Sequence, residues 1–135
     1  MIVVDASVVM KWIEEEKDTA IARAFQMNHL EGKEEIVAPQ LLFYEIANTL
    51  STKSFTTPSY IAVGLDLLSK MHLVVFKEEQ EDILQAALLA REYHVAFYDM
   101  LYVVVAQKSE CLLVTADERF VKKTKFPFVK LISEI

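Results

Sequence analysis

The sequence predicts an α/β fold built around a parallel β-sheet. Short apolar runs alternate along the chain with longer stretches of helical periodicity, as expected for strands buried on both faces and helices that cover them. The chain has 135 residues, which suits one domain over residues 1–135, and its 53% hydrophobic content allows a substantial core. It contains only two glycines, so turn-dense all-β folds are disfavoured.

The first strand is expected at Ile2–Val4, a short β-branched run. Ser7 is a suitable N-cap for a helix that continues through Trp12, because a serine hydroxyl can accept a hydrogen bond from a free backbone N–H. Asp18 can open a second helix, which presents one apolar face and ends before Gly32.

The second strand is expected at Ile36–Ala38. Pro39 then begins a helix that runs to about Thr52, because proline fits the first helical turn, where its missing N–H costs nothing. Thr57, which is followed by another proline, opens a further helix. Leu73–Phe76 is expected to form the third strand.

Glu78–Tyr93 has apolar residues at helical spacing and is expected to form an amphipathic helix. Cys111–Thr115 and Phe128–Ile132 are the fourth and fifth strands, and Asp117–Thr124 is a short helix between them. The segment Met100–Ala106 is apolar on all sides, so it fits a fully buried helix as well as a strand paired with the fourth strand.

Composition excludes several classes of protein. With 20 acidic and 14 basic residues, the net charge of −6 argues against a protein that simply coats nucleic acid or an anionic membrane. Two well-separated glycines cannot form a P-loop or a dinucleotide-binding turn, and the single cysteine permits no internal disulfide. Because no secretory signal or membrane-spanning run is seen, we expect a cytoplasmic protein with no membrane partner.

Four acidic residues occupy positions at which the fold would gather ligands. Asp5 ends the first strand and Asp117 follows the fourth, so both are expected at the carboxyl edge of the sheet, where α/β proteins bind ligands. Glu45 interrupts an otherwise apolar helix, and Asp99 opens the ambiguous apolar segment. Asn48 shares the helical stripe of Glu45.

Taken singly, each aspartate has a simpler explanation as a helix N-cap, and Glu45 could pair with a distant cation. Taken together, carboxylates at one site repel one another unless a cation lies between them. Mg²⁺ prefers such oxygen ligands, and the chemistry that requires this arrangement is metal-assisted hydrolysis of phosphodiesters.

The same residues carry a resemblance to a known family. Four segments, in this order, resemble the motifs of PIN-domain ribonucleases of the small prokaryotic kind that includes VapC-type toxins: Val4–Val9, Pro39–Asn48, Phe97–Tyr102 and Val114–Phe120. The resemblance spans most of the chain. It implies a three-layer α/β/α sandwich with a five-stranded parallel sheet of order 3-2-1-4-5, and a helix for the ambiguous segment.

The resemblance also implies a function. It assigns metal coordination and catalysis to Asp5, Glu45, Asp99 and Asp117, and supporting roles to Ser7, Asn48 and Thr115. An enzyme of this kind would be a Mg²⁺- or Mn²⁺-dependent endoribonuclease that acts on RNA, the toxin partner of a small antitoxin protein, and commonly a homodimer.

A basic cluster follows Asp117 and could contact the phosphate backbone of RNA beside the metal, although a solvated helix face would look the same. Its members are Arg119, Lys122, Lys123 and Lys125. Tyr98 and Tyr102 flank Asp99, and packing in the core or in a dimer is favoured for them over base stacking.

Two other functions remain open at this point. A PIN-fold protein could process RNA without being a toxin, or could bind RNA or a partner without cutting. A phosphoacceptor receiver domain also places acidic residues at strand ends, but it needs an aspartate at the end of the third strand, where this chain has Phe76 and Lys77.

Overall fold

The computed structural model describes all of residues 1–135 and contains one five-stranded sheet in which every neighbouring pair is parallel. The strand order is β3-β2-β1-β4-β5, which confirms the expected α/β fold and sheet order. It differs from the 2-1-3-4-5 order of receiver domains and so argues against that alternative. The strands are β1 (Ile2–Val4), β2 (Ile36–Pro39), β3 (Val74–Phe76), β4 (Leu112–Thr115) and β5 (Val129–Leu131).

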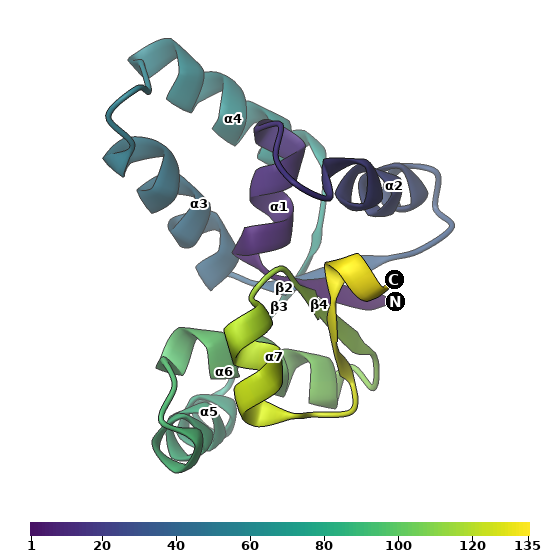
Figure 1. Cartoon of the computed structure of the whole chain (residues 1–135), viewed down its shortest axis with the longest axis vertical. Coiled ribbons are helices and arrows are strands. Elements are labelled where there is room, and N and C mark those ends of the chain that lie inside the picture. The colour runs from purple at the N-terminus through teal and green to yellow at the C-terminus, as the bar shows by residue number, and fades with distance from the viewer.

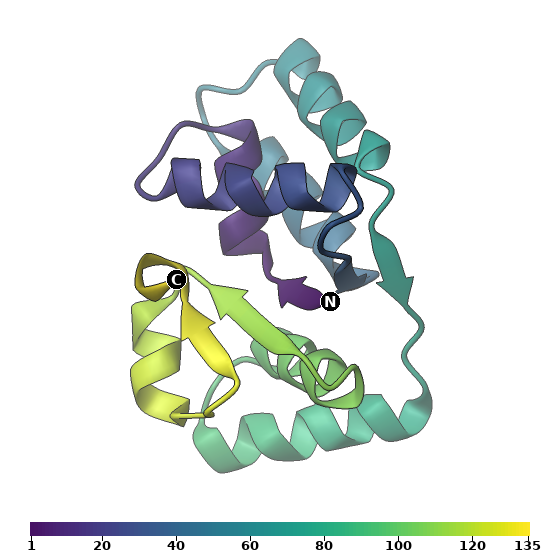
Figure 2. The ribbon, with the colours of Figure 1, turned by 90° about the vertical axis from the view of Figure 1, so that its right-hand side faces the viewer.

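Helices cover both faces of the sheet and complete three layers. The chain passes through α1 to α4 on one side, and α5 to α7 lie on the other (Figures 1 and 2). No helix has the length and hydrophobicity needed to cross a membrane. The helices are α1 (Ala6–Ile13), α2 (Thr19–Leu30), α3 (Leu41–Thr52), α4 (Pro58–Lys70), α5 (Gln80–Tyr93), α6 (Phe97–Lys108), α7 (Glu118–Thr124) and a short 3₁₀ helix, η1 (Ile132–Glu134).

The ambiguous apolar segment is helical. Met100–Ala106 forms the body of α6, and every residue in it is buried. A helix that is apolar on all sides must be enclosed on all sides, and α6 is packed between α5 and the central strands. Asp99 lies in the first turn of α6 and is not its N-cap, which is Ala96. The buried side chains of all layers form one continuous core of 30 residues.

Three local predictions are wrong, each for an identifiable reason. The N-cap of α1 is Asp5, not Ser7, because the hydroxyl of Ser7 is engaged with the neighbouring strand loop. Pro39 ends β2 and does not begin α3. Pairing between β2 and β1 stops at Val37, but pairing between β2 and β3 continues to Pro39, which lies opposite Phe76. The fifth strand is shorter than expected, because η1 begins at Ile132.

Helix α5 forms where expected, but it is less well covered than its sequence suggests. Its N-cap is Glu79, and a capping box joins Glu79 to Asp82. Of the apolar stripe, Ala86 is buried, whereas Ile83 is 47% exposed, because α5 contacts mainly α6 at the outside of its layer.

Candidate active site at the carboxyl edge of the sheet

Two of the predicted acidic residues lie at the carboxyl edge of adjacent strands. Asp5 directly follows β1, and Asp117 comes two residues after the end of β4. The two strands are paired in register, with Val4 opposite Val114, and the backbone N–H of Asp5 donates to the carbonyl of Val114. The central pair of strands therefore carries both carboxylates to the same edge.

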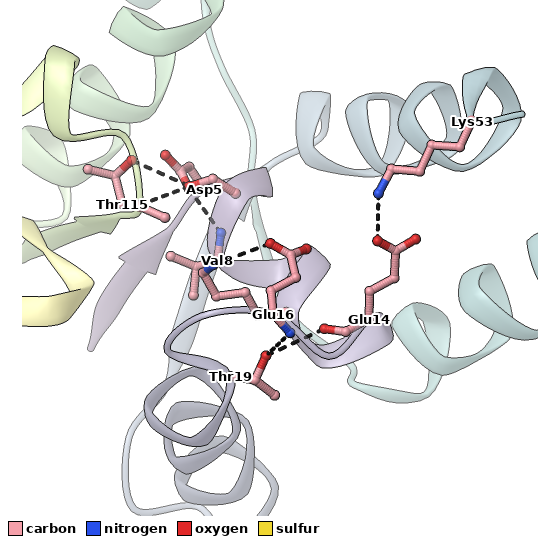
Figure 3. A network of polar contacts seen from close by, with 10 residues as sticks. Asp5, Val8, Glu14, Glu16, Thr19, Lys53 and Thr115 are labelled. Atoms are coloured by element: carbon pink, nitrogen blue, oxygen red, sulfur yellow. Dashed lines mark hydrogen bonds and ion pairs between the residues drawn. The ribbon is translucent and has the colours of Figure 1, made fainter. Parts of the chain in front are cut away.

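Asp5 is held by a set of short-range hydrogen bonds. Its Oδ1 accepts from the hydroxyl of Ser7 at 2.5 Å and from the backbone N–H of Val8 at 3.3 Å. Figure 3 shows Asp5 between Val8 and Thr115. Burial raises the pKa of Asp5, and the hydrogen bonds from Ser7 and Thr115 offset only part of that rise. The carboxylate that caps α1 is thus the same one that lies at the carboxyl edge of the sheet, and its charge acts on Glu45 and Asp99.

Ser7 and Thr115 join the loop after β4 to the start of α1. The Ser7 hydroxyl accepts from the backbone N–H of Ala116 at 2.9 Å, and the two hydroxyl oxygens are 3.5 Å apart. Thr115 Oγ1 accepts from the N–H of Asp117 at 3.0 Å, and Asp117 Oδ1 in turn caps α7 by accepting from the N–H of Phe120. Both residues therefore lie where they can orient Asp5 and Asp117.

Glu45 reaches the site from α3 and is anchored by Tyr102 of α6. The Tyr102 hydroxyl donates to Glu45 Oε1 at 2.7 Å, and the tyrosine is almost fully buried. The sequence analysis assigned Tyr102 to packing and missed this contact. The spacing could have indicated it, because Tyr102 comes three residues after Asp99 and therefore lies on the same side of the helix. Burial raises the pKa of Glu45, and the charge of Asp5 raises it further.

Asp99 shows that the four carboxylates act on one another. Its pKa is raised to about 6, chiefly by burial and further by the charges of three other carboxylates. Those carboxylates belong to Asp5, Asp117 and Glu45. None of the four takes part in any ion pair of the structure, although eight such pairs occur elsewhere in it. The site thus concentrates negative charge, and no basic side chain forms an ion pair with any of the four carboxylates.

The donor set fits a hard divalent cation, although it does not enclose one. All four side chains offer carboxylate oxygens, yet no three acidic, histidine or cysteine side chains approach closely enough to form a ready-made metal cage. Mg²⁺ is commonly held by only one or two carboxylates, with water and substrate phosphate completing its coordination. An open acidic site of this kind suits Mg²⁺ better than a metal that needs an all-protein cage.

A groove of about 490 Å³ opens beside Asp99 and Asp117. Three of the four predicted basic residues line it, namely Arg119, Lys122 and Lys123. Lys122 is paired with Glu118, and Lys123 donates to the carbonyl of His94, whereas Arg119 forms no ion pair.

Two predicted site residues are not joined to this arrangement. Lys125 lies at the end of α7 and does not line the groove. Asn48 is exposed on α3, and its side chain forms no hydrogen bond; its backbone carbonyl accepts from the hydroxyls of Ser51 and Thr52.

Solved structures share this fold over nearly the whole chain. PAE2754 from Pyrobaculum aerophilum is 22% identical, with a TM-score of 0.70 over 98% of this chain and 91% of that one. A toxin–antitoxin complex from Klebsiella pneumoniae is 13% identical, with a TM-score of 0.72 over 100% of both chains. The Mycobacterium tuberculosis toxin VapC20, described as cleaving the sarcin–ricin loop, is 14% identical, with a TM-score of 0.67 over 92% of this chain and 95% of that one.

Sequence comparison gives the family. No curated protein matches the chain. The model of the PIN domain family, however, matches residues 2–126, a range that includes all four acidic residues, the supporting hydroxyls and the groove. The chain belongs to the PIN domain family.

Proposed function

We propose that the protein is an endoribonuclease that depends on Mg²⁺ or Mn²⁺ and serves as the toxin of a toxin–antitoxin pair. The observation that carries this proposal is the convergence of four carboxylates, without a counter-ion, at the carboxyl edge of β1 and β4. A cation bound there would relieve their repulsion and attract the phosphate of an RNA strand.

The residues would divide the work as follows. Asp5, Glu45, Asp99 and Asp117 would hold the cation, which when bound activates water and stabilises negative charge during phosphodiester hydrolysis. Ser7 and Thr115 keep the carboxylate of Asp5 and the loop before Asp117 in place.

The groove beside Asp99 and Asp117 would take the RNA backbone. Arg119, which forms no ion pair, is the residue best placed to contact a phosphate there, with Lys122 and Lys123 beside it. Asn48 and Lys125 belong to the same proposal as accessory residues, Asn48 because of the family motif and Lys125 because of its charge.

The proposal of a toxin role is supported by the solved structures that share this fold. One structural neighbour is a toxin–antitoxin complex and another is an RNA-cleaving toxin, both covered almost completely. We therefore propose a small antitoxin as partner, a homodimeric toxin and a cytoplasmic location. The alternative is an RNA-processing enzyme of the same fold. A neighbouring gene that encodes a short DNA-binding antitoxin would favour the toxin over this alternative.

The test is cleavage of a structured RNA with a fluorescent label. Cleavage is expected with Mg²⁺ or Mn²⁺, and its loss with EDTA. The variant Asp5→Asn should lose at least two orders of magnitude in rate, whereas Asp66→Asn, which changes an exposed aspartate on α4, should cut like the wild type. Undiminished cleavage by Asp5→Asn would refute the assigned site.

A further inference from the structure

Tyr102 is the one polar side chain inside a fully buried stretch of helix. It lies in the middle of Met100–Ala106, where all the other residues are apolar. Only 2% of Tyr102 is exposed, and its hydroxyl forms a single hydrogen bond, to Glu45 Oε1 at 2.7 Å. The same bond is the only hydrogen bond of the Glu45 side chain.

Packing alone does not explain a tyrosine at this position. Phenylalanine would fill the same space, and burying a hydroxyl without a partner costs about 1–3 kcal/mol. The hydroxyl of Tyr102 is satisfied only because Glu45 reaches it from α3, which covers the opposite face of the sheet from α6 (Figure 1). The contact therefore crosses the edge of the sheet at the acidic site.

The Tyr102 hydroxyl is the only polar group that holds the carboxylate of Glu45. No cation pairs with it, and the hydrogen bond to Oε1 is what restricts the carboxylate to one orientation. In that orientation Oε2 has no protein partner and remains available to another ligand. Hydrogen bonds of this kind commonly orient the carboxylates that hold metal ions.

We propose that Tyr102 is a positioning residue: its hydroxyl fixes Oε1 of Glu45 so that Oε2 is presented to the divalent cation. The inference rests on the proposed function, since it takes Glu45 to be a metal ligand. Tyr102 itself touches neither metal nor RNA in this scheme and acts entirely through Glu45.

The test measures Mn²⁺ binding directly, by titration of the metal-free full chain and detection of free Mn²⁺ by electron paramagnetic resonance. Tyr102→Phe should weaken Mn²⁺ binding about tenfold, the lower end of the range for loss of such outer contacts. Tyr98→Phe is the matched control, because Tyr98 lies on the same helix, is exposed and forms no side-chain hydrogen bond. At saturating Mn²⁺, Tyr102→Phe should recover most of the wild-type kcat.

A double-mutant cycle separates positioning from general damage to the core. In the Glu45→Gln background, where the metal ligand is already lost, Tyr102→Phe should weaken Mn²⁺ binding by less than twofold. An equal loss in both backgrounds would show that Tyr102 does not act through Glu45 and would overturn the inference. This comparison remains decisive even if Tyr102→Phe lowers the melting temperature, because destabilisation would affect both backgrounds alike.

The two proposals fail differently. Wild-type Mn²⁺ affinity in Tyr102→Phe, together with metal-dependent cleavage by the wild type, would overturn the role of Tyr102 and leave the proposed function intact. A wild-type protein that neither binds Mn²⁺ nor cuts RNA would overturn both.

Discussion

At the scale of single residues, the negative charge of Asp99 lowers the stability of the metal-free protein. Its pKa of about 6 in the folded protein exceeds the ordinary value of 3.8, so the folded state holds a proton more tightly than the unfolded chain does. The metal-free protein therefore loses stability as the pH rises from about 4 to about 6, and the full penalty persists above that range. A bound cation would remove the penalty.

Asp99→Asn should accordingly stabilise the metal-free protein at neutral pH while weakening its site. We expect a gain of about 1–2 kcal/mol at pH 7.5, after allowance for solvent screening of a partly exposed group, and almost none at pH 4. Urea unfolding in the presence of EDTA at both values of pH measures this. A variant that is less stable than the wild type at pH 7.5 would contradict the proposed repulsion.

The sequence analysis was most successful for residues whose position follows from the order of the strands. Asp5 and Asp117 follow strands that lie side by side, so their meeting follows from strand order alone. The capping role of Ser7 could not be judged in this way, because its competitor Asp5 is two residues away and equally suited to the position. The Tyr102–Glu45 contact depends on side chains from two layers and was beyond any local pattern.

At the scale of elements, Glu14 joins three helices through two hydrogen bonds. It follows α1, and its carboxylate accepts from Lys53 Nζ at the end of α3 at 2.5 Å and from the Tyr60 hydroxyl of α4 at 2.9 Å. Figure 3 shows the contact between Glu14 and Lys53. Burial alone would raise the pKa of Glu14, but the bonds from Lys53 and Tyr60 outweigh it and lower the pKa below 4.5.

Glu14→Gln should therefore destabilise the protein in a manner that depends on pH. Because the folded pKa is lowered, the stabilisation is present at neutral pH and is lost in acid, as the pH falls through this lowered pKa. We expect a loss of about 1–2 kcal/mol at pH 7, which disappears near pH 3. Thermal unfolding at the two values of pH tests this, with Glu15→Gln, an exposed neighbour, as control. An equal loss at both values would exclude the charge as its source.

Helix α4 packs closely against α3 at Gly64. A Cβ at Gly64 would lie 2.9 Å from Cδ1 of Leu50, a fully buried residue of α3. Gly64→Val should destabilise the fold by about 1–3 kcal/mol, since the extra methyl groups displace a core side chain. Chemical unfolding measures the loss, and the double variant Gly64→Val with Leu50→Ala should lose less stability than the sum of the two single variants. Full wild-type stability in Gly64→Val would contradict the packing.

The order of the elements was predictable, but their ends and one element type were less so. Short apolar strands alternating with helices point to a parallel sheet wherever they occur, and that pattern runs through this chain. Met100–Ala106 could not be assigned from its own sequence, because a buried helix and a buried strand are both apolar throughout. The structure shows that it is a helix, packed between α5 and the sheet.

At the scale of the whole molecule, the acidic site depends on nearly the full length of the chain, since its four carboxylates lie between residues 5 and 117. A cation that binds only the assembled site should stabilise the whole fold, because one core connects all layers. At 100 times its dissociation constant, Mn²⁺ should add about 2.7 kcal/mol, and a melting curve should show a single transition shifted upward by several degrees.

The same experiment contains its own control. The Mn²⁺-induced rise in melting temperature should vanish in Asp5→Asn and persist in Asp66→Asn, whose exposed aspartate lies on α4. An equal rise in both variants would place the stabilising cation elsewhere on the surface.

The central place of β1 in the sheet has a consequence for protein synthesis. β1 is made first, but it pairs on one side with β4, whose residues 112–115 leave the ribosome only after most of the chain. Until then Asp5 has no neighbouring Thr115 or Asp117, and the acidic site does not exist. If the protein cuts RNA, a growing chain is therefore harmless to the ribosome that makes it until the last third of the domain has emerged and folded.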